Sequence, residues 1–150
     1  MVSTLERPAL TTPAESAIVM SIHPRWVDAI LSGHKTFELR RRAPDRELAK
    51  GIMIYSTAPT SALVAIGDIQ DIVRAPPQLL WSEIGTMSGC SKAEFFQYFE
   101  GVNVASALKL TNVRRISPLP LALLRSRIGW HPPVSWMKAT EELIQLAELQ

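Results

Sequence analysis

The segment from residue 33 to residue 42, GHKTFELRRR, constrains the fold more than any other stretch of the chain. Residues 24–33, which lead into it, begin with a proline that a first helical turn tolerates. They end with a glycine that can leave a helix with a positive φ. After Gly33, apolar and polar residues alternate, which is the pattern of a strand with one buried face. The segment therefore predicts a short helix followed at once by a half-buried strand.

The alternation also predicts which side chains of this strand face the core. Phe37 and Leu39 share one face, and Glu38 and Arg40 share the other. Because an unpaired charge is costly to bury, we expect the two apolar side chains to be buried and the two charged ones to line a polar cleft. Lys35 has the parity of Phe37, so on a regular strand it would face away from Glu38. It either belongs to the preceding turn or is re-aimed by a bulge.

The glycine, lysine, glutamate and arginine within residues 33–40 spell Gly-x-Lys-x-x-Glu-x-Arg. This pattern resembles the signature of the ASCH domain family, a branch of the PUA-like β-barrels. The resemblance extends upstream through Ser-Ile-His-Pro and a helix that ends in Ile-Leu-Ser-Gly. Downstream it includes two expected strands, residues 51–57 and 62–69. It covers residues 18–73 of the chain.

The remaining segments fit one domain of this type. Residues 17–22 are an apolar, β-branched run that predicts a buried first strand, and residues 103–116 predict a late strand that stops at the Ser-Pro-Leu-Pro of residues 117–120. The resemblance implies an α/β (α+β) fold over residues 17–150: a PUA-like, mostly antiparallel β-barrel of five or six strands with peripheral helices. The pattern is also compatible with an open α+β sheet. Residues 1–16 are expected to be a flexible lead-in.

Helices are expected in the second half of the chain. Residues 77–84 have proline in the first turn and are followed by glycine. Residues 91–100 begin with Ser91 and carry Glu94 three positions later, which is the spacing of a capping box. The phenylalanines of this helix form an apolar stripe and predict core packing. Ser135 is expected to cap a final helix.

Basic residues are concentrated in two segments, although the net charge of the chain is only +2. Residues 25–50 hold seven basic residues against four acidic ones. Residues 109–138 hold six basic residues and no acidic one. The two segments could form one electropositive surface that attracts phosphates, or they could lie on opposite sides of the molecule.

The family resemblance implies a nucleic-acid-binding protein as the first of three function classes, with RNA as the expected partner. A base or nucleotide would be recognised in a cleft lined by the motif, while basic side chains contact phosphate. Single-stranded nucleic acid or a modified nucleoside would suit the same cleft. The expected contact residues are Lys35, Glu38, Arg40, Arg41, Arg42, Tyr55, Ser56, Arg114 and Arg115.

Three ring-bearing side chains allow two interpretations each. His23 lies between a strand and Pro24, and we expect it to be a hydrogen-bonded structural residue rather than a catalyst. Tyr55 could stack on a base or complete the core. Trp130 could stack beside the arginines of the second basic segment, or be buried against the last helix.

The second class is an enzyme. The resemblance implies either an amidohydrolase that removes an acetyl group from modified cytidine, or a ribonuclease. In either case the catalytic candidates are Lys35 and Glu38. The amidohydrolase relatives carry a threonine where this chain has Glu38, and Glu83 is the nearest candidate for their glutamate. The third class is a protein-interaction module, which would be recognised by binding that survives high salt.

Composition excludes several other classes of site. No apolar run approaches the roughly 18 residues of a membrane helix, and the N-terminus lacks the pattern of a secretory signal, so the expected location is the cytoplasm. The one cysteine, Cys90, cannot form an internal disulfide, and no cysteine or histidine spacing predicts a metal site. No cofactor is expected, and the sequence leaves the oligomeric state open.

Overall fold

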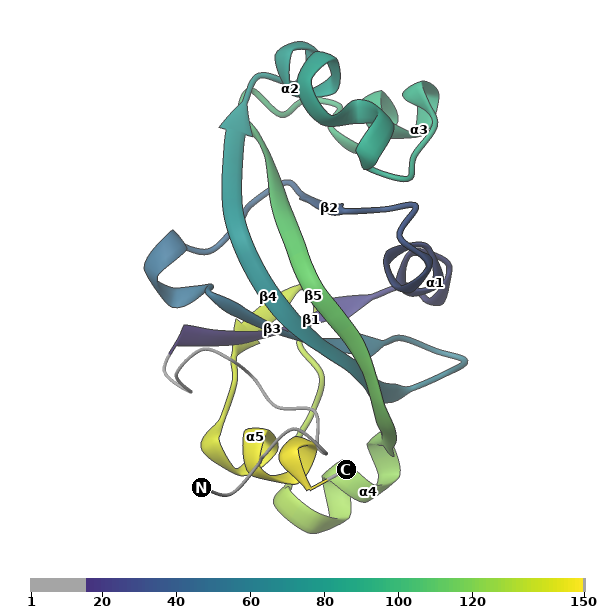
Figure 1. Cartoon of the computed structure of the whole chain (residues 1–150), viewed down its shortest axis with the longest axis vertical. Coiled ribbons are helices and arrows are strands. Elements are labelled where there is room, and N and C mark those ends of the chain that lie inside the picture. Colours follow the sequence, from purple (N-terminus) through teal and green to yellow (C-terminus); the bar gives the residue numbers. More distant parts are fainter. Residues whose placement is uncertain (1–15, 150) are drawn as a thin grey trace, which may run out of the picture.

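A mixed sheet organises residues 16–149, the part of the chain that the computed structural model describes (Figure 1). In this part six strands pair in the order β2-β5-β4-β3-β1-β6 and curl into a half-barrel. Only β1 and β3 pair in parallel, so the mostly antiparallel sheet predicted from the sequence is confirmed. The predicted lead-in lies, except for residue 16, outside the described residues. The strands are β1 Ala17–Ile22, β2 Phe37–Arg40, β3 Gly51–Ser56, β4 Ala62–Ala75, β5 Ala105–Pro120 and β6 Trp136–Lys138.

The helices gather at three places around this sheet (Figure 1). Helices α2 and α3 lie beyond one end of the long strands β4 and β5, α4 and α5 lie at the other end, and α1 lies beside β2. Each group covers its own cluster of buried apolar side chains. The helices are α1 Pro24–Ser32, α2 Pro77–Ile84, α3 Lys92–Tyr98, α4 Leu121–Ile128 and α5 Glu141–Glu148, with 3₁₀ turns η2 Arg46–Leu48 and η3 Gly85–Met87.

Strand β5 corrects the expectation that the chain breaks at residues 117–120. The strand continues to Pro120, which pairs with Ala62, and Leu119 pairs with Leu63. Proline has no backbone N–H to donate to a neighbouring strand. At its prolines β5 pairs with β4 alone, because β2 pairs only with residues 106–109 of β5. Proline is tolerated on such an edge.

The predicted capping of the last helix by Ser135 is wrong. Residues 136–138 form β6, which pairs antiparallel with β1, and α5 begins three residues later. Thr140 is the cap, since its hydroxyl accepts from the backbone N–H of Leu143. The buried face of α5 includes Leu143 and Ile144.

Helices α2 and α3 have a core of their own. Phe95 is fully buried and packs edge-on against Trp81, Phe96 and Phe99, with ring centroids 4.9–5.2 Å apart. This cluster also includes Phe37 and Leu39, the inward face predicted for β2. The capping box predicted for α3 is present. The packing therefore fixes the two helices to the strand that carries the motif.

Replacing Phe95 by Ala should destabilise the protein by about 3–5 kcal/mol, because the cavity it leaves cannot collapse inside a ring cluster. Leu79 is half exposed on α2. Leu79→Ala is therefore the matched control, expected to change stability by about 0.5 kcal/mol or less. Urea unfolding followed by circular dichroism measures both. Equal effects of the two substitutions would show that the ring cluster is not a packed core.

Candidate functional site

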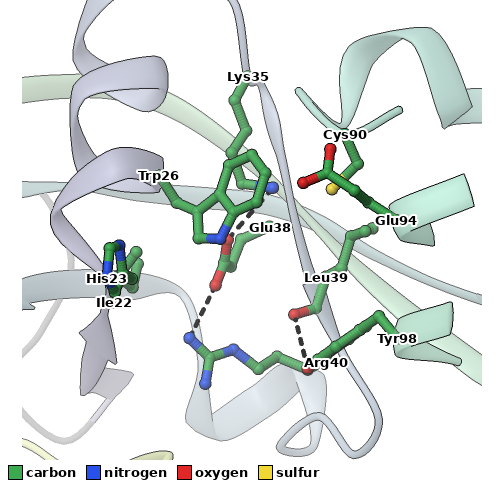
Figure 2. Close-up of a pocket in the computed structure, with 10 residues that line it drawn as sticks. All are labelled: Ile22, His23, Trp26, Lys35, Glu38, Leu39, Arg40, Cys90, Glu94 and Tyr98. Carbon is green, nitrogen blue, oxygen red and sulfur yellow. Dashed lines mark hydrogen bonds and ion pairs between the residues drawn. The ribbon is translucent and has the colours of Figure 1, made fainter. Parts of the chain in front are cut away.

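A pocket of about 200 Å³ lies between α1, β2 and α3 (Figure 2). One wall comes from the start of α1, the floor from β2 and the turn before it, and the other wall from α3 and the residue two positions before it. The lining residues are Ile22, His23, Trp26, Lys35, Glu38, Leu39, Arg40, Cys90, Glu94 and Tyr98.

Lys35 reaches this pocket from the turn before β2. Gly33 ends α1 with a φ of 88°, and β2 begins only at Phe37. The backbone N–H of Lys35 donates to Ala29 O, which holds it against the end of α1. Of the two alternatives for its orientation, the turn is confirmed. Gly89, at a φ of +76°, makes room for the lysine stem, since a side chain there would come within 3.0 Å of the Lys35 Cβ.

A buried carboxylate between two cations forms the centre of the site (Figure 2). Glu38 Oε1 lies 3.4 Å from Lys35 Nζ, and Glu38 Oε2 accepts from Arg40 Nη2 at 2.7 Å. Lys35 and Glu38 are 3% and 5% exposed. Phe37 and Leu39 are buried, and Glu38 and Arg40 line the pocket, as expected. The parity does not keep the charges apart from the core, however, because Glu38 is as buried as Phe37 and Leu39 also lines the pocket. We call Lys35, Glu38 and Arg40 the charged triad.

The charged triad is also tied to other segments. Lys35 Nζ donates to Ser88 O at 2.6 Å. Arg40 Nη2 donates to Ser21 O at 2.9 Å, and Arg40 Nη1 donates to Ser135 Oγ at 3.1 Å. Arg40 Nε is buried without a hydrogen-bond partner among the described residues. Charge-assisted hydrogen bonds of this kind are the stronger ones in proteins, so the triad is held rigidly.

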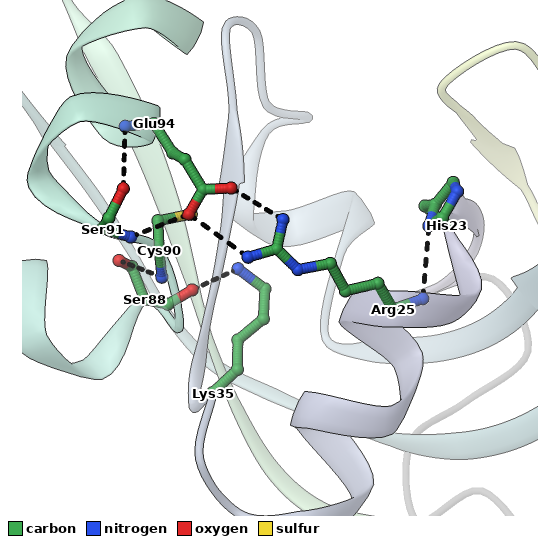
Figure 3. Close-up of polar contacts among 7 residues, drawn as sticks. All are labelled: His23, Arg25, Lys35, Ser88, Cys90, Ser91 and Glu94. Atoms are coloured by element: carbon green, nitrogen blue, oxygen red, sulfur yellow. Dashed lines mark hydrogen bonds and ion pairs between the residues drawn. The ribbon is translucent and has the colours of Figure 1, made fainter.

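An ion pair joins α1 to α3 beside the pocket, between Arg25 and the lining residue Glu94 (Figure 3). Arg25 donates from both terminal nitrogens to Glu94, at 2.6 and 3.3 Å. The Arg25 guanidinium also lies 4.1 Å from the centroid of the Trp26 ring. Lys35 Nζ lies 5.0 Å from the centroid of the same ring. The hydrogen bond from Arg25 lowers the pKa of Glu94 from 4.5 to about 2. Burial raises the pKa of the nearby Cys90 thiol, which favours the less reactive protonated form.

His23 has the structural role expected from the sequence. It is the N-cap of α1, and its Nδ1 accepts from the backbone N–H of Arg25 at 3.2 Å (Figure 3). With Nδ1 accepting, the proton of the neutral ring lies on Nε2. The exposed ring also lines the pocket, where Nε2–H is a hydrogen-bond donor.

Arg41 and Arg42 do not line the pocket. Arg41 Nη1 donates to Tyr98 O at 2.8 Å and to Glu100 O at 3.2 Å. It thus fixes the end of α3 beside β2. Arg42 is exposed beyond the end of β2. The three consecutive arginines therefore have different places: Arg40 lines the pocket, Arg41 anchors α3 and Arg42 lies at the surface.

The other predicted contact residues lie elsewhere. Tyr55 and Ser56 are buried, and the Tyr55 ring packs against Trp130 with centroids 5.5 Å apart. Both rings therefore pack in the core. Arg114 and Arg115 are on β5, where they line a different groove, on the other side of α1.

Seven of the lining residues were not predicted as site residues: Ile22, His23, Trp26, Leu39, Cys90, Glu94 and Tyr98. The spacing of Trp26 fits the apolar face of α1, which accounts for it without a site. Glu94 has the capping-box spacing that explains it locally, and nothing in the spacing shows that it also reaches α1. The hydroxyl of Tyr98 among three phenylalanines is the one sequence signal that could have pointed to the pocket.

This arrangement can bind a small planar group that carries hydrogen-bond acceptors. The triad offers ammonium and guanidinium donors beside one carboxylate acceptor, and the indole of Trp26 offers an apolar face. Among residues 16–149, no cluster of three or more histidine, cysteine or acidic side chains could hold a metal ion. Each helix of that range is too short or too polar to cross a membrane.

The model of the ASCH domain matches residues 20–117, a segment that contains β2, the pocket and most of the sheet. The chain belongs to the ASCH domain family. The resemblance inferred from residues 18–73 is thus confirmed and extends further along the chain.

Comparisons with known proteins agree with this membership. A protein of Zymomonas mobilis named an ASCH domain-containing ribonuclease is 34% identical over 139 residues, which cover 89% of this chain and 94% of that protein. The crystal structure of ASCH from Zymomonas mobilis is 33% identical and matches with a TM-score of 0.80 over 87% of this chain and 92% of that one. The fold is therefore the PUA-like fold of ASCH domains.

A more distant structure shares the fold alone. The N-terminal domain of Staphylothermus marinus McrB is 12% identical and matches with a TM-score of 0.59, over 95% of this chain and 99% of that one. The ASCH fold thus persists where the sequences have diverged.

Replacing Glu38 by Ala should destabilise the protein by about 3–5 kcal/mol, because Lys35 and Arg40 would stay buried without their counter-charge. Glu83, exposed on α2, gives the control substitution Glu83→Ala, with an expected change of about 0.5 kcal/mol or less. The free energy of unfolding in urea measures both. If Glu38→Ala lowers the free energy of unfolding no more than Glu83→Ala does, burial of the two cations does not depend on the Glu38 carboxylate.

The Arg25–Glu94 pair predicts a loss of stability in acid. Folding lowers the pKa of Glu94 from 4.5 to about 2. The ionised carboxylate therefore stabilises the folded state fully above its ordinary pKa, and this contribution is lost as the pH falls through about 2. Glu94→Gln keeps the capping spacing but removes the charge. We expect the stability difference between wild type and Glu94→Gln to be constant at neutral pH and to shrink below pH 4.5. A difference that is the same at both ends of a urea-unfolding pH series would contradict the pairing.

Proposed function

We propose that the protein binds RNA and holds one base or nucleotide in the pocket between α1, β2 and α3. The observation that carries the proposal is the buried charged triad, whose donors and acceptor line a concave site beneath Trp26. The relative named a ribonuclease, at 34% identity, supports RNA as the class of ligand.

The size of the pocket favours a single base. Pockets for whole drug-sized molecules are roughly 300–1,000 Å³, whereas this one is about 200 Å³. Single-stranded RNA can place an unstacked base in such a site, because its base edges and ring faces are free. Stacking on an aromatic side chain contributes about 1–3 kcal/mol per base, and Trp26 has a ring at the pocket wall.

The charged triad would read the edge of that base. Lys35 and Arg40 donate to carbonyl oxygens or ring nitrogens, and the Glu38 carboxylate accepts from an amino group. Each carboxylate oxygen has two lone pairs, so contacts with Lys35 and Arg40 leave capacity for a ligand donor. Lys35 lies in the turn before β2 and Glu38 lies in β2 itself, so both side chains are held in place for recognition of the base edge.

Lys35→Ala should weaken binding of single-stranded RNA by about 1–3 kcal/mol, the range for losing a charge-assisted hydrogen bond. Lys35→Arg keeps the charge and should recover part of the loss. The exposed Lys138, on β6 and outside the pocket, provides the charge-matched control Lys138→Ala. Fluorescence anisotropy with a labelled RNA hexamer measures the dissociation constants, and circular dichroism confirms that each variant is folded.

The salt dependence of the same titrations identifies the kind of partner. Each phosphate contact to single-stranded RNA contributes a slope of about 0.7 in a plot of log affinity against log salt. Three or four contacts would give a slope of roughly −2 to −3. Absence of RNA binding at low salt would reject the proposal, and binding of a protein partner that survives high salt would favour an interaction module.

Ribonuclease activity is the second candidate, and the name of the Zymomonas mobilis relative favours it. Lys35 and Glu38 would then be the catalytic residues, since both touch the space that a bound nucleotide would occupy. Incubation of wild type with labelled single-stranded RNA tests this. If wild type cleaves the RNA, and both Lys35→Ala and Lys35→Arg lose cleavage but still bind, the protein is a ribonuclease and not only a binding protein. Amidohydrolase activity on acetylcytidine has less support. Glu83, the nearest candidate for the glutamate of that activity, is exposed on α2 and does not line the pocket.

A further inference from the structure

A second groove, of about 380 Å³, lies on the other side of α1 from the pocket. Helix α1 contributes Asp28, Leu31 and Ser32, and β5 contributes three consecutive residues, Val113, Arg114 and Arg115. The function proposed above does not use this groove.

A β-bulge explains how three consecutive residues of one strand come to line the same groove. Thr111 pairs with Asp68 and Arg114 pairs with Ile66, so two residues of β5 oppose Gly67 alone. The first of them, Asn112, has a φ of 56°, in the left-handed region. A bulge of this kind twists the strand and re-aims the side chains that follow it.

Gly67 is the residue that permits the bulge. A Cβ at this position would lie 2.8 Å from Val113 Cγ2 and 3.0 Å from Val113 Cα, closer than atoms in a well-packed interior approach. Gly67 in β4 therefore allows β5 to bulge and to turn its arginines toward the groove.

Two arginines of β5 line the groove. Arg115 is exposed. Arg114 Nη1 donates to Asn112 O at 2.8 Å, which orients its guanidinium along the strand. Among residues 16–149, Asp28 is the carboxylate that lines the groove beside the two arginines. Arginine presents a planar fork of donors that matches the geometry of a phosphate.

Helix α1 is the wall shared by the pocket and the groove. Trp26 and Asp28 are two residues apart, which places them about 200° apart around the helix axis. Trp26 lines the pocket and Asp28 lines the groove. A strand that crosses the helix, which is about 10–12 Å across with its side chains, could therefore reach both depressions at once.

We propose that the groove of Arg114 and Arg115 is a second RNA subsite that binds a backbone phosphate of the same strand whose base occupies the pocket. This inference rests on the proposed function. It makes RNA binding depend on length, because a nucleoside monophosphate reaches only the pocket, whereas an oligonucleotide crosses α1.

The test compares two charge-matched double variants. Arg114→Ala with Arg115→Ala removes two charges from the groove. Arg125→Ala with Arg127→Ala removes two charges from exposed positions on α4. Binding of a single-stranded RNA hexamer and of the four nucleoside monophosphates is measured over a salt series. We expect the groove variant to bind the hexamer about tenfold more weakly and to flatten its salt slope by about 0.7, the value for one lost phosphate contact. Its binding of monophosphates should match that of wild type.

The other outcomes separate the two proposals. Equal losses in both double variants would overturn the groove and indicate unspecific attraction. Loss of monophosphate binding in the groove variant would also overturn it, because the groove would then not be a separate subsite. A wild type that binds no RNA rejects both the groove and the proposed function, whereas hexamer binding unchanged in the groove variant rejects the groove alone. If the double variant fails to fold, Arg115→Glu, at an exposed position, gives the same test with a reversed charge.

Discussion

The buried carboxylate of Glu38 is the interaction on which the rest of the site depends. It neutralises one cation from the turn before β2 and one from the end of β2, and each cation in turn holds a carbonyl from a distant part of the chain. Lys35 reaches the segment between α2 and α3, and Arg40 reaches the end of β1 and the residue before β6. A buried charge without its partners costs several kcal/mol, so the carbonyls and the charges stabilise one another.

The position of α2 and α3 follows from both apolar and polar contacts. The inward face of β2 contributes to the ring cluster around Phe95, while its outward face carries the charges. Four residues of one short strand thus serve the core on one side and the site on the other. The Arg25–Glu94 pair and the anchor provided by Arg41 complete the attachment from the surface.

Local patterns predicted local structure well. The parity of β2, the glycine that ends α1 and the capping box of α3 each depend on residues within a few positions of one another, and all three were predicted from the sequence. The site was predicted only in part, because its other half comes from far along the chain. The contact between Arg40 and Ser135 spans 95 positions, and no spacing rule applies at that range. The prolines of residues 117–120 were wrongly predicted to end the strand for the same reason. Whether proline is tolerated in a strand depends on which strands pair with it, and these are distant in the sequence.

The shared wall formed by α1 has a thermodynamic consequence. A ligand that shifts this helix alters the shape of the pocket and of the groove together, because opposite faces of one rigid element line them. Any such influence is a coupling free energy, and it is reciprocal: the factor by which a phosphate in the groove changes affinity for a base equals the factor by which the base changes affinity for the phosphate. If both sites bind as proposed, the nine residues of α1 are the element through which the two affinities are coupled.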